Sequence, residues 1–178
     1  MEVYYKYDIH WNYDGGYIGY KKLLGEMSKY DSNLKIIPLS NYKRKLRYTP
    51  TADLCKQLSL EHVLLNKEWY YQPVFEIGYR ETEGAIYPLT LASAATKRTF
   101  KEKSNSPKVI VYRDSYFNLI YPFFSENFRE CIYIWSNIMV LEVLEKEKPD
   151  YVVYEITERY IDRLLEENPE WVKNTSSE

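Results

Sequence analysis

Cysteine, histidine and long apolar runs are all scarce in this sequence. Its two cysteines, Cys55 and Cys131, lie far apart without C-x-x-C spacing, so no zinc site or redox pair is expected. Buried free thiols are favoured over a single disulfide. No apolar run approaches the roughly 20 residues that span a bilayer, and the first residues lack the apolar segment of a signal peptide. The sequence therefore predicts no membrane segment in this chain.

Charge of one sign is also lacking. The 24 Lys and Arg residues nearly balance 26 Asp and Glu residues, which leaves a net charge of −2. Such a chain has no global field to attract nucleic acid or an anionic membrane, so neither partner is expected. A short basic run over residues 41–50 is interpreted as a solvated face rather than a polyanion site.

The chain does have many aromatic residues, 17% of the total, of which 20 are tyrosines. Tyrosines can stack on sugar rings, although packing on apolar faces is the stronger interpretation for most of them. A length of 178 residues fits one domain with a sizeable core. We expect a single domain over 1–167 and a polar tail over 168–178.

A histidine with a nearby carboxylate stands near the start of the chain, in Asp8-Ile9-His10-Trp11-Asn12. An Asp two residues before a His in a turn can hold the imidazole in one tautomer for general-base work. A helix is predicted from about 15 to 29, with Gly15-Gly16 as a tight turn before it. The second histidine, His62, has no ligand spacing around it and is interpreted as a surface or structural residue.

A candidate nucleophile follows the apolar run Val109-Ile110-Val111-Tyr112, where the sequence continues Arg113-Asp114-Ser115-Tyr116. A serine at a sharp strand-to-helix turn is exposed beside the positive end of the helix, as acyl-transfer enzymes require. By themselves, a D-x-H and a distant D-S are weak signals, and purely structural roles are favoured over catalysis.

The C-terminal half alternates between strand and helix patterns. Strands are predicted at 109–112, 131–135 and 151–154, with helices after Ser115, from Ile138 to Glu145, and from Ile156 onward. This order predicts right-handed crossovers and a parallel sheet. Ligands gather beyond the carboxyl ends of such strands. Ser115 follows one strand at that edge, and Glu155, Thr157 and Glu158 follow another.

The middle of the chain is less regular. A short strand is predicted at 35–39, a helix start with Thr51 or Asp53 as N-cap, and a β-hairpin whose strands are 73–79 and 85–89. The polar stretch 96–107 is predicted to be an exposed loop.

Three blocks together resemble the SGNH-hydrolase-like domain of the alginate O-acetyltransferase (AlgX/AlgJ-like) family and the related bacterial DHHW proteins. They are the stretch 8–20 that begins Asp8-Ile9-His10-Trp11, the serine block 113–116, and the closing stretch 148–160. In that family Asp and His precede the serine, as they do here. Arg113 departs from the pattern, because SGNH serine blocks usually have glycine there. The resemblance implies an α/β, SGNH-hydrolase-like three-layer sandwich with a mainly parallel sheet and a β-hairpin insertion.

Carried over by position, the resemblance implies Ser115 as nucleophile, His10 as general base and Asp8 as its orienting partner, with no metal and no cofactor. Trp11, Tyr116 and Arg113 are expected to bind substrate. The implied reaction is O-acetyl transfer to, or removal from, an extracellular polysaccharide through an acetyl-enzyme.

The implied partners are a sugar acceptor, an acetyl donor and a membrane-bound acetyl-export protein, and the implied location is extracytoplasmic or the cell envelope. Because relatives carry sequence upstream of the first block, an N-terminally truncated fragment is expected. The alternatives are a non-catalytic polysaccharide-binding module and an intracellular interaction domain.

Overall fold

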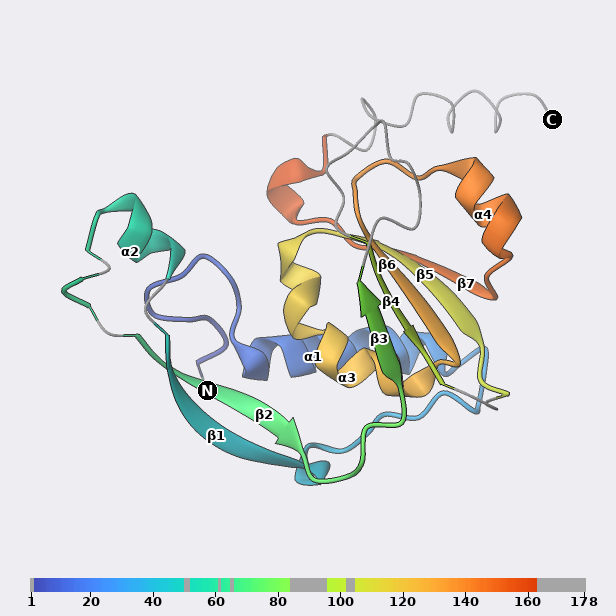
Figure 1. The fold of residues 1–178 in the computed structure, drawn as a ribbon, viewed down its shortest axis with the longest axis horizontal. Coiled ribbons are helices and arrows are strands. Elements are labelled where there is room, and N and C mark those ends of the chain that lie inside the picture. The colour runs from blue at the N-terminus through green and yellow to red at the C-terminus, as the bar shows by residue number, and fades with distance from the viewer. Residues whose placement is uncertain are drawn as a thin grey trace. The chain divides into compact units, whose positions relative to one another are not determined.

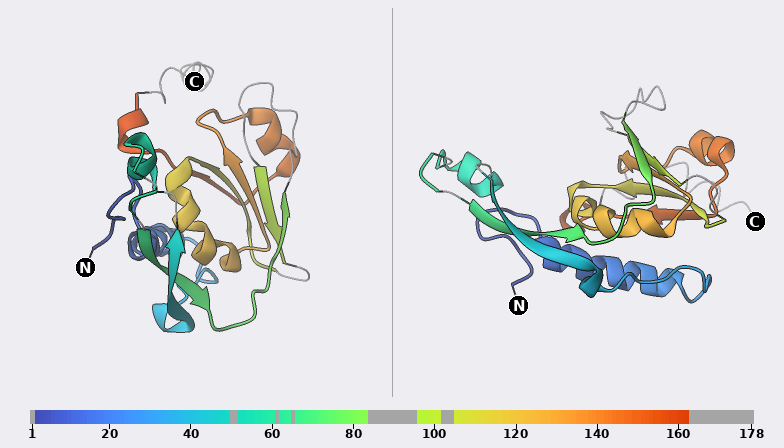
Figure 2. Two further views of the ribbon diagram at one scale, coloured as in Figure 1. Left: turned by 60° about the vertical axis from the view of Figure 1, so that its left-hand side comes forward. Right: turned by 60° about the horizontal axis from the view of Figure 1, so that its bottom comes forward.

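The chain forms two compact units (Figures 1 and 2). The computed structural model describes residues 2–49, 52–60, 62–64, 66–83, 96–101 and 105–162. The first unit comprises Met1–Gly78 and Asn118–Glu126, and the second comprises Tyr79–Phe117 and Asn127–Glu178. The predicted tail 168–178 lies outside the described residues, and the single-domain assignment stays a prediction.

The first unit is built on α1 (Tyr13–Met27). Asn12 caps this helix, because its side-chain oxygen accepts a hydrogen bond of 3.0 Å from the Gly15 N–H. Tyr17, Tyr20 and Leu24 recur on one face and are buried. The helix predicted for 15–29 is therefore confirmed, but Gly15-Gly16 lie inside it and do not form a turn before it.

A two-stranded antiparallel sheet of β1 (Tyr42–Thr49) and β2 (Asn66–Pro73) completes most of this unit. α2 (Asp53–Gln57) lies between these strands in sequence, and a 3₁₀ turn, η1 (Leu39–Asn41), precedes β1. The short α3 (Tyr121–Phe124) brings Phe123 within 5.2 Å of the Tyr17 ring and 5.0 Å of the Tyr42 ring. An aromatic core thus joins α1, α3 and the β1–β2 sheet.

The second unit is organised around a five-stranded sheet in the order β3-β4-β6-β5-β7. The bounds of its strands are β3 (Arg80–Glu83), β4 (Thr96–Phe100), β5 (Lys108–Arg113), β6 (Glu130–Trp135) and β7 (Tyr151–Tyr154). β5 pairs in parallel with both β6 and β7, whereas β4 runs antiparallel to β3 and β6. Val143 of α4 (Leu141–Glu147) packs on Ile110, Tyr112, Ile132 and Ile134, which form the core of this sheet.

The predicted mainly parallel sheet is wrong, because the sheet is mixed and a separate antiparallel pair lies in the other unit. The three C-terminal strands are present and mutually parallel where β5 meets β6 and β7. Residues 81–83 of the expected hairpin turn belong to β3, which pairs with β4; Gly84 and the predicted strand 85–89 lie outside the described residues. The stretch 96–107 was interpreted as a loop, but its first residues form β4.

Local elements also differ from the predictions. Residues 35–39 form no strand, and Ala52, not Asp53, is the N-cap of α2. In place of a helix after Ser115, the chain makes the 3₁₀ turn η2 (Ser115–Leu119), then α3 and the 3₁₀ turn η3 (Ser125–Asn127). The last predicted helix appears as the 3₁₀ turn η4 (Glu158–Tyr160) within the described residues. Cys55 and Cys131 are buried free thiols, as predicted.

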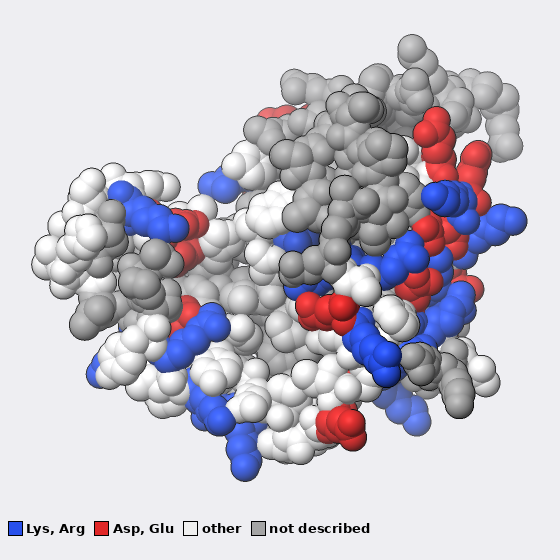
Figure 3. Space-filling model, in the orientation of Figure 1, with Lys and Arg blue, Asp and Glu red and all other residues white. Residues whose placement is uncertain are grey.

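Ion pairs join several elements of the second unit. The Lys108 ammonium of β5 lies 2.5 Å from Glu147 of α4 and 3.1 Å from Glu130 of β6, and Arg98 of β4 contacts the same two carboxylates. On the face shown in Figure 3, basic and acidic side chains of the described residues are interspersed. In the described residues no helix is long and apolar enough to cross a membrane.

Candidate functional site

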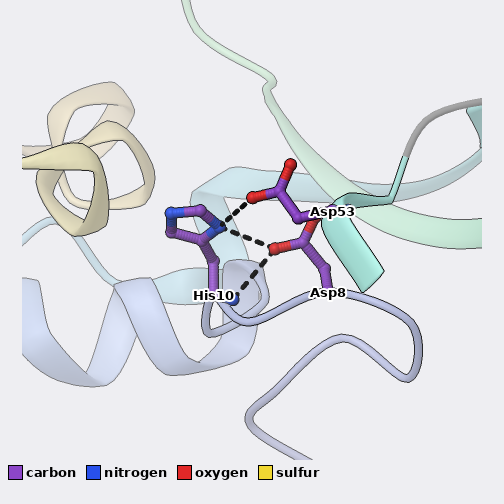
Figure 4. Close-up of side chains that lie close together, drawn as sticks. All are labelled: Asp8, His10 and Asp53. Carbon is purple, nitrogen blue, oxygen red and sulfur yellow. Dashed lines mark hydrogen bonds and ion pairs between the residues drawn. The ribbon is translucent and has the colours of Figure 1, made fainter. Parts of the chain in front are cut away.

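The loop before α1 brings Asp8 and His10 into direct contact (Figure 4). The Nδ1 atom of His10 lies 2.6 Å from Oδ1 of Asp8, and the same oxygen accepts a hydrogen bond of 2.9 Å from the His10 backbone N–H. Both side chains are only about a fifth exposed or less, at 21% and 16%. The turn from Asp8 to His10 thus holds the imidazole against the Asp8 carboxylate. This is the arrangement predicted from the D-x-H pattern.

The Asp8 carboxylate is held in its ionised form. Burial alone would raise its pKa, but hydrogen bonds from the backbone N–H groups of His10 and Asp53, and from the His10 imidazole, together lower the pKa below the ordinary value. The Asp53 N–H reaches the second carboxylate oxygen, Oδ2, at 3.1 Å. An ionised, anchored carboxylate at Nδ1 favours the tautomer in which Nε2 is the basic nitrogen.

Asp53 also belongs to this cluster, although the sequence indicated it only as a possible N-cap of a helix. Its carboxylate lies 3.6 Å from His10 Nδ1, and no local pattern links it to a loop 45 residues earlier. Ligand atoms of Asp8, His10 and Asp53 all lie within 4.8 Å of one another, so this is the group among the described residues that could hold a metal ion. The 2.6 Å distance from His10 Nδ1 to Asp8 matches a hydrogen bond and favours a proton at that nitrogen.

Ser115 lies in the second unit, two residues after the end of β5, and is half-buried. The preceding residue, Asp114, is buried and holds the turn: its Oδ1 accepts from the Tyr116 N–H at 2.8 Å, and its Oδ2 accepts from the Thr157 N–H at 2.8 Å. The Thr157 hydroxyl also donates to Oδ2. The serine is therefore placed at the carboxyl end of β5, on a turn tied to the segment that follows β7.

Glu155, the residue after β7, also contacts the serine turn. Its Oε2 accepts a hydrogen bond of 2.9 Å from the Asp114 N–H. Burial, reinforced by the nearby Asp114 carboxylate, raises the pKa of Glu155 to about 8 despite the opposing effects of that hydrogen bond and of Arg113. Near neutral pH Glu155 is thus largely a neutral acid beside the serine turn.

Arg113 is buried at the end of β5, with its guanidinium 4.5 Å from the Trp135 ring centroid and one N–H donating to the Asp114 carbonyl at 3.2 Å. Burial lowers the pKa of Arg113. These contacts support the serine turn where glycine was expected from the resemblance. Substrate binding by Arg113 stays a prediction.

The other two expected substrate residues lie in different units. Trp11 forms a β-bridge with Tyr4 and packs on α1, where its indole lies 2.9 Å from the position that a Cβ on Gly19 would take. Tyr116 follows Ser115 in η2 and is half-buried. Their roles as substrate residues stay predictions.

The structure therefore brings together two groups of predicted residues. Asp8 and His10 meet in the first unit, and Arg113, Ser115 and Tyr116 adjoin one another in the second. The assignment of Ser115 and His10 to one catalytic centre stays a prediction. Histidine 62 is exposed, as predicted.

No protein-family model matches the chain, and no curated protein matches its sequence. The fold is an α/β fold of known type. A DHHW family protein from Eubacterium siraeum matches with a TM-score of 0.65 and 17% identity, over 86% of this chain and 58% of that one. Bacillus cereus PatB1 matches with a TM-score of 0.62 and 16% identity, over 86% of this chain and 61% of that one.

At such low sequence identity, these structural matches show a shared fold and nothing more. The resemblance to DHHW-related proteins predicted from the sequence is confirmed at that level. This chain spans about three fifths of the length of both solved structures. The O-acetyltransferase domain of Pseudomonas putida AlgJ aligns at 16% identity with a TM-score of 0.46, which is too low to support an inference.

Proposed function

We propose that this chain carries the acyl-transfer centre of a serine-dependent O-acetyltransferase or acetylesterase. Ser115 is the nucleophile, His10 the general base and Asp8 the residue that orients His10. The observation that carries the proposal is the anchored Asp8–His10 pair, whose 2.6 Å contact leaves the base role to Nε2. The fixed turn at Ser115 is the second support.

The reaction has two half-reactions. In the first, Ser115 Oγ attacks the acetyl carbonyl carbon while His10 Nε2 takes the hydroxyl proton. The bond to the donor's leaving group then breaks, and His10 returns the proton to that group. In the second, His10 deprotonates a sugar hydroxyl or water, whose oxygen attacks the acetyl carbonyl carbon. The ester bond to Ser115 Oγ then breaks, and His10 returns the proton to that oxygen.

The acceptor class in this proposal is a polysaccharide hydroxyl, with water as the competing acceptor. It follows from the resemblance of the three sequence blocks, as do an acetyl donor, a membrane-bound acetyl-export partner and an extracytoplasmic location. Trp11 and Tyr116 are proposed to line the acceptor side, where aromatic rings can stack on sugars. No cofactor is required by these steps.

The test is hydrolysis of a chromogenic acetyl ester. Ser115→Ala and His10→Ala each remove a group that acts in the transition state, so each should lower kcat/KM by about a thousandfold or more. Ser32→Ala and His62→Ala remove an exposed serine and an exposed histidine and serve as matched controls that should retain activity.

Activity that survives in Ser115→Ala, in a sample shown by circular dichroism to be folded, would refute the assignment. An inactive parent chain that binds acetylated or unmodified glycan equally well with and without Ser115 would instead favour the binding-module alternative.

A further inference from the structure

The imidazole of His10 faces two carboxylates rather than one (Figure 4). Asp8 Oδ1 lies 2.6 Å from His10 Nδ1, and Asp53 Oδ2 lies 3.6 Å from the same nitrogen. Asp8 comes from the same loop as His10, whereas Asp53 is the first residue of α2. All three residues belong to the first unit.

The start of α2 is tied to the histidine loop by its backbone. The Asp53 N–H donates to Asp8 Oδ2 at 3.1 Å, and the Leu54 N–H donates to the Tyr7 carbonyl at 3.2 Å. Ala52 and Cys55 on either side are buried, at 1% and 2% exposure. These backbone hydrogen bonds therefore fix the main chain of Asp53 next to the loop that carries His10.

The side chain of Asp53 is not used to cap its own helix. Ala52 is the N-cap residue, and it makes no side-chain cap hydrogen bond. At 39% exposure Asp53 is partly solvated, and 3.6 Å is too long for a hydrogen bond but close enough for charge to act on the imidazole. Asp53 is thus the second carboxylate beside Nδ1, after Asp8.

We propose that Asp53 is a second positioning residue for His10. Its backbone N–H anchors Asp8, and its carboxylate is a reserve acceptor for the Nδ1 proton, so that Nε2 keeps the role of base. The effect of Asp53 on catalysis rests on the proposed function, whereas its effect on the tautomer of His10 does not depend on that function. The expected signature is redundancy between Asp8 and Asp53.

The tautomer can be measured in ¹⁵N-labelled protein from long-range ¹H–¹⁵N imidazole spectra. The chain has only two histidines, so His62→Gln assigns the His10 signals. Asp8→Asn should retain a substantial Nδ1–H fraction because Asp53 can accept that proton. The double variant Asp8→Asn/Asp53→Asn should convert His10 mainly to the Nε2–H form, the wrong tautomer for a base. Glu26→Gln, which removes an exposed carboxylate from the same unit, is the control.

Ester hydrolysis gives a second, kinetic measurement. Asp53→Asn alone should lower kcat by less than about tenfold, Asp8→Asn by about 10- to 100-fold, and the double variant by about 10⁴-fold, more than the product of the single losses. Asp53→Asn retains the backbone N–H that donates to Asp8 Oδ2, so the loop stays in place in that variant. Asp8→Asn replaces one of two acceptor oxygens by an NH2 group, so circular dichroism first establishes that both variants with this change are folded.

Asp53→Asn that leaves both the tautomer and kcat unchanged, in the parent and in Asp8→Asn, would overturn the inference. So would activity that is lost on chelation and restored by Zn²⁺, because a metal would then occupy Nδ1. If the parent hydrolyses no ester but the double variant still switches the tautomer, the proposed function fails while the role of Asp53 stands.

Discussion

Glu155 shows how one side chain can report on the serine turn. Its carboxyl group is buried next to Asp114 and accepts the Asp114 N–H at 2.9 Å. Its pKa rises from an ordinary value of 4.5 to about 8 in the folded chain, so the folded state holds a proton that the unfolded state has released. Between these two pH values the folded state binds more protons, and the stabilising contribution of Glu155 must fall as pH rises.

We therefore predict a decline in the free energy of unfolding from about pH 5 to pH 8, to which Glu155 contributes. The contribution is complete below about pH 4.5 and is lost once the pH passes about 8. Glu155→Gln keeps an acceptor for Asp114 but cannot ionise. It should flatten this decline and gain roughly 1–3 kcal/mol over the parent at pH 8.

Urea denaturation at several pH values measures this difference. Glu158→Gln, which changes an exposed glutamate three residues later, is the matched control and should leave the slope as in the parent. A parallel pH dependence in Glu155→Gln and the parent would show that Glu155 is ionised in the folded state.

The candidate site was predictable where its geometry is local. Asp8 and His10 are two residues apart, so a turn suffices to join them, and the 2.6 Å contact follows the pattern. Asp53 could not be predicted, since its link to Asp8 spans 45 residues and depends on how α2 is anchored. Asp114 and Thr157 meet because β5 and β7 are parallel neighbours; the strand pattern predicted parallel strands but not this strand order.

The same distinction holds for whole elements. α1, β5, β6 and β7 carry strong periodic or continuous apolar patterns and were predicted from them. β4 was interpreted as a loop because Lys97 and Arg98 are charged, yet the strand is stabilised by pairing with β3 and β6 and by ion pairs from Arg98 to Glu130 and Glu147. These partners are remote in sequence, so no local window could reveal them.

Gly16 and Gly25 of α1 differ in the space around them, which allows a test of why glycine stands inside this helix. A Cβ on Gly16 would overlap the Leu119 carbonyl group, with the carbonyl carbon and the Leu119 Cβ both 2.7 Å away. A Cβ on Gly25 would meet only the end of the Ile36 side chain, at 3.9 Å. Because both positions are helical, Gly→Ala gains up to about 1 kcal/mol of helix propensity at each.

Gly16→Ala should nevertheless destabilise the protein by roughly 1–3 kcal/mol, because main chain must move to admit the methyl group. Gly25→Ala should be neutral or stabilising by up to about 1 kcal/mol. The midpoints of urea unfolding, with unchanged slopes, provide the comparison. Equal effects of the two substitutions would contradict the close approach of α1 to the segment at Leu119.

At the scale of the whole molecule, the proposed chemistry depends on residues from two units. His10 belongs to Met1–Gly78, and Ser115 belongs to Tyr79–Phe117. Because the proposal takes its nucleophile from one unit and its base from the other, it predicts activity only when both units are present in one folded chain. This requirement can be tested without knowing the natural acetyl donor.

A sulfonyl fluoride is a suitable probe, because it reacts covalently with a serine hydroxyl that a neighbouring base activates. Attack by Ser115 Oγ would form an oxygen–sulfur bond and expel fluoride, while the hydroxyl proton passes to His10. We expect one sulfonyl group per chain, located at Ser115 by peptide mass spectrometry. His10→Ala should slow the labelling by about 10²- to 10⁴-fold, because the hydroxyl loses its base.

His62→Ala, the control, should be labelled at the parent's rate, and unfolding in urea should abolish the selectivity for Ser115. Equal labelling of Ser115 in the parent and in folded His10→Ala would mean that the two residues do not work together. That result would leave the anchored Asp8–His10 pair and the serine turn as separate structural features. If His10→Ala loses the labelling and His62→Ala keeps it, His10 and Ser115 must meet in solution. A base can take a proton only from a hydroxyl within hydrogen-bond reach.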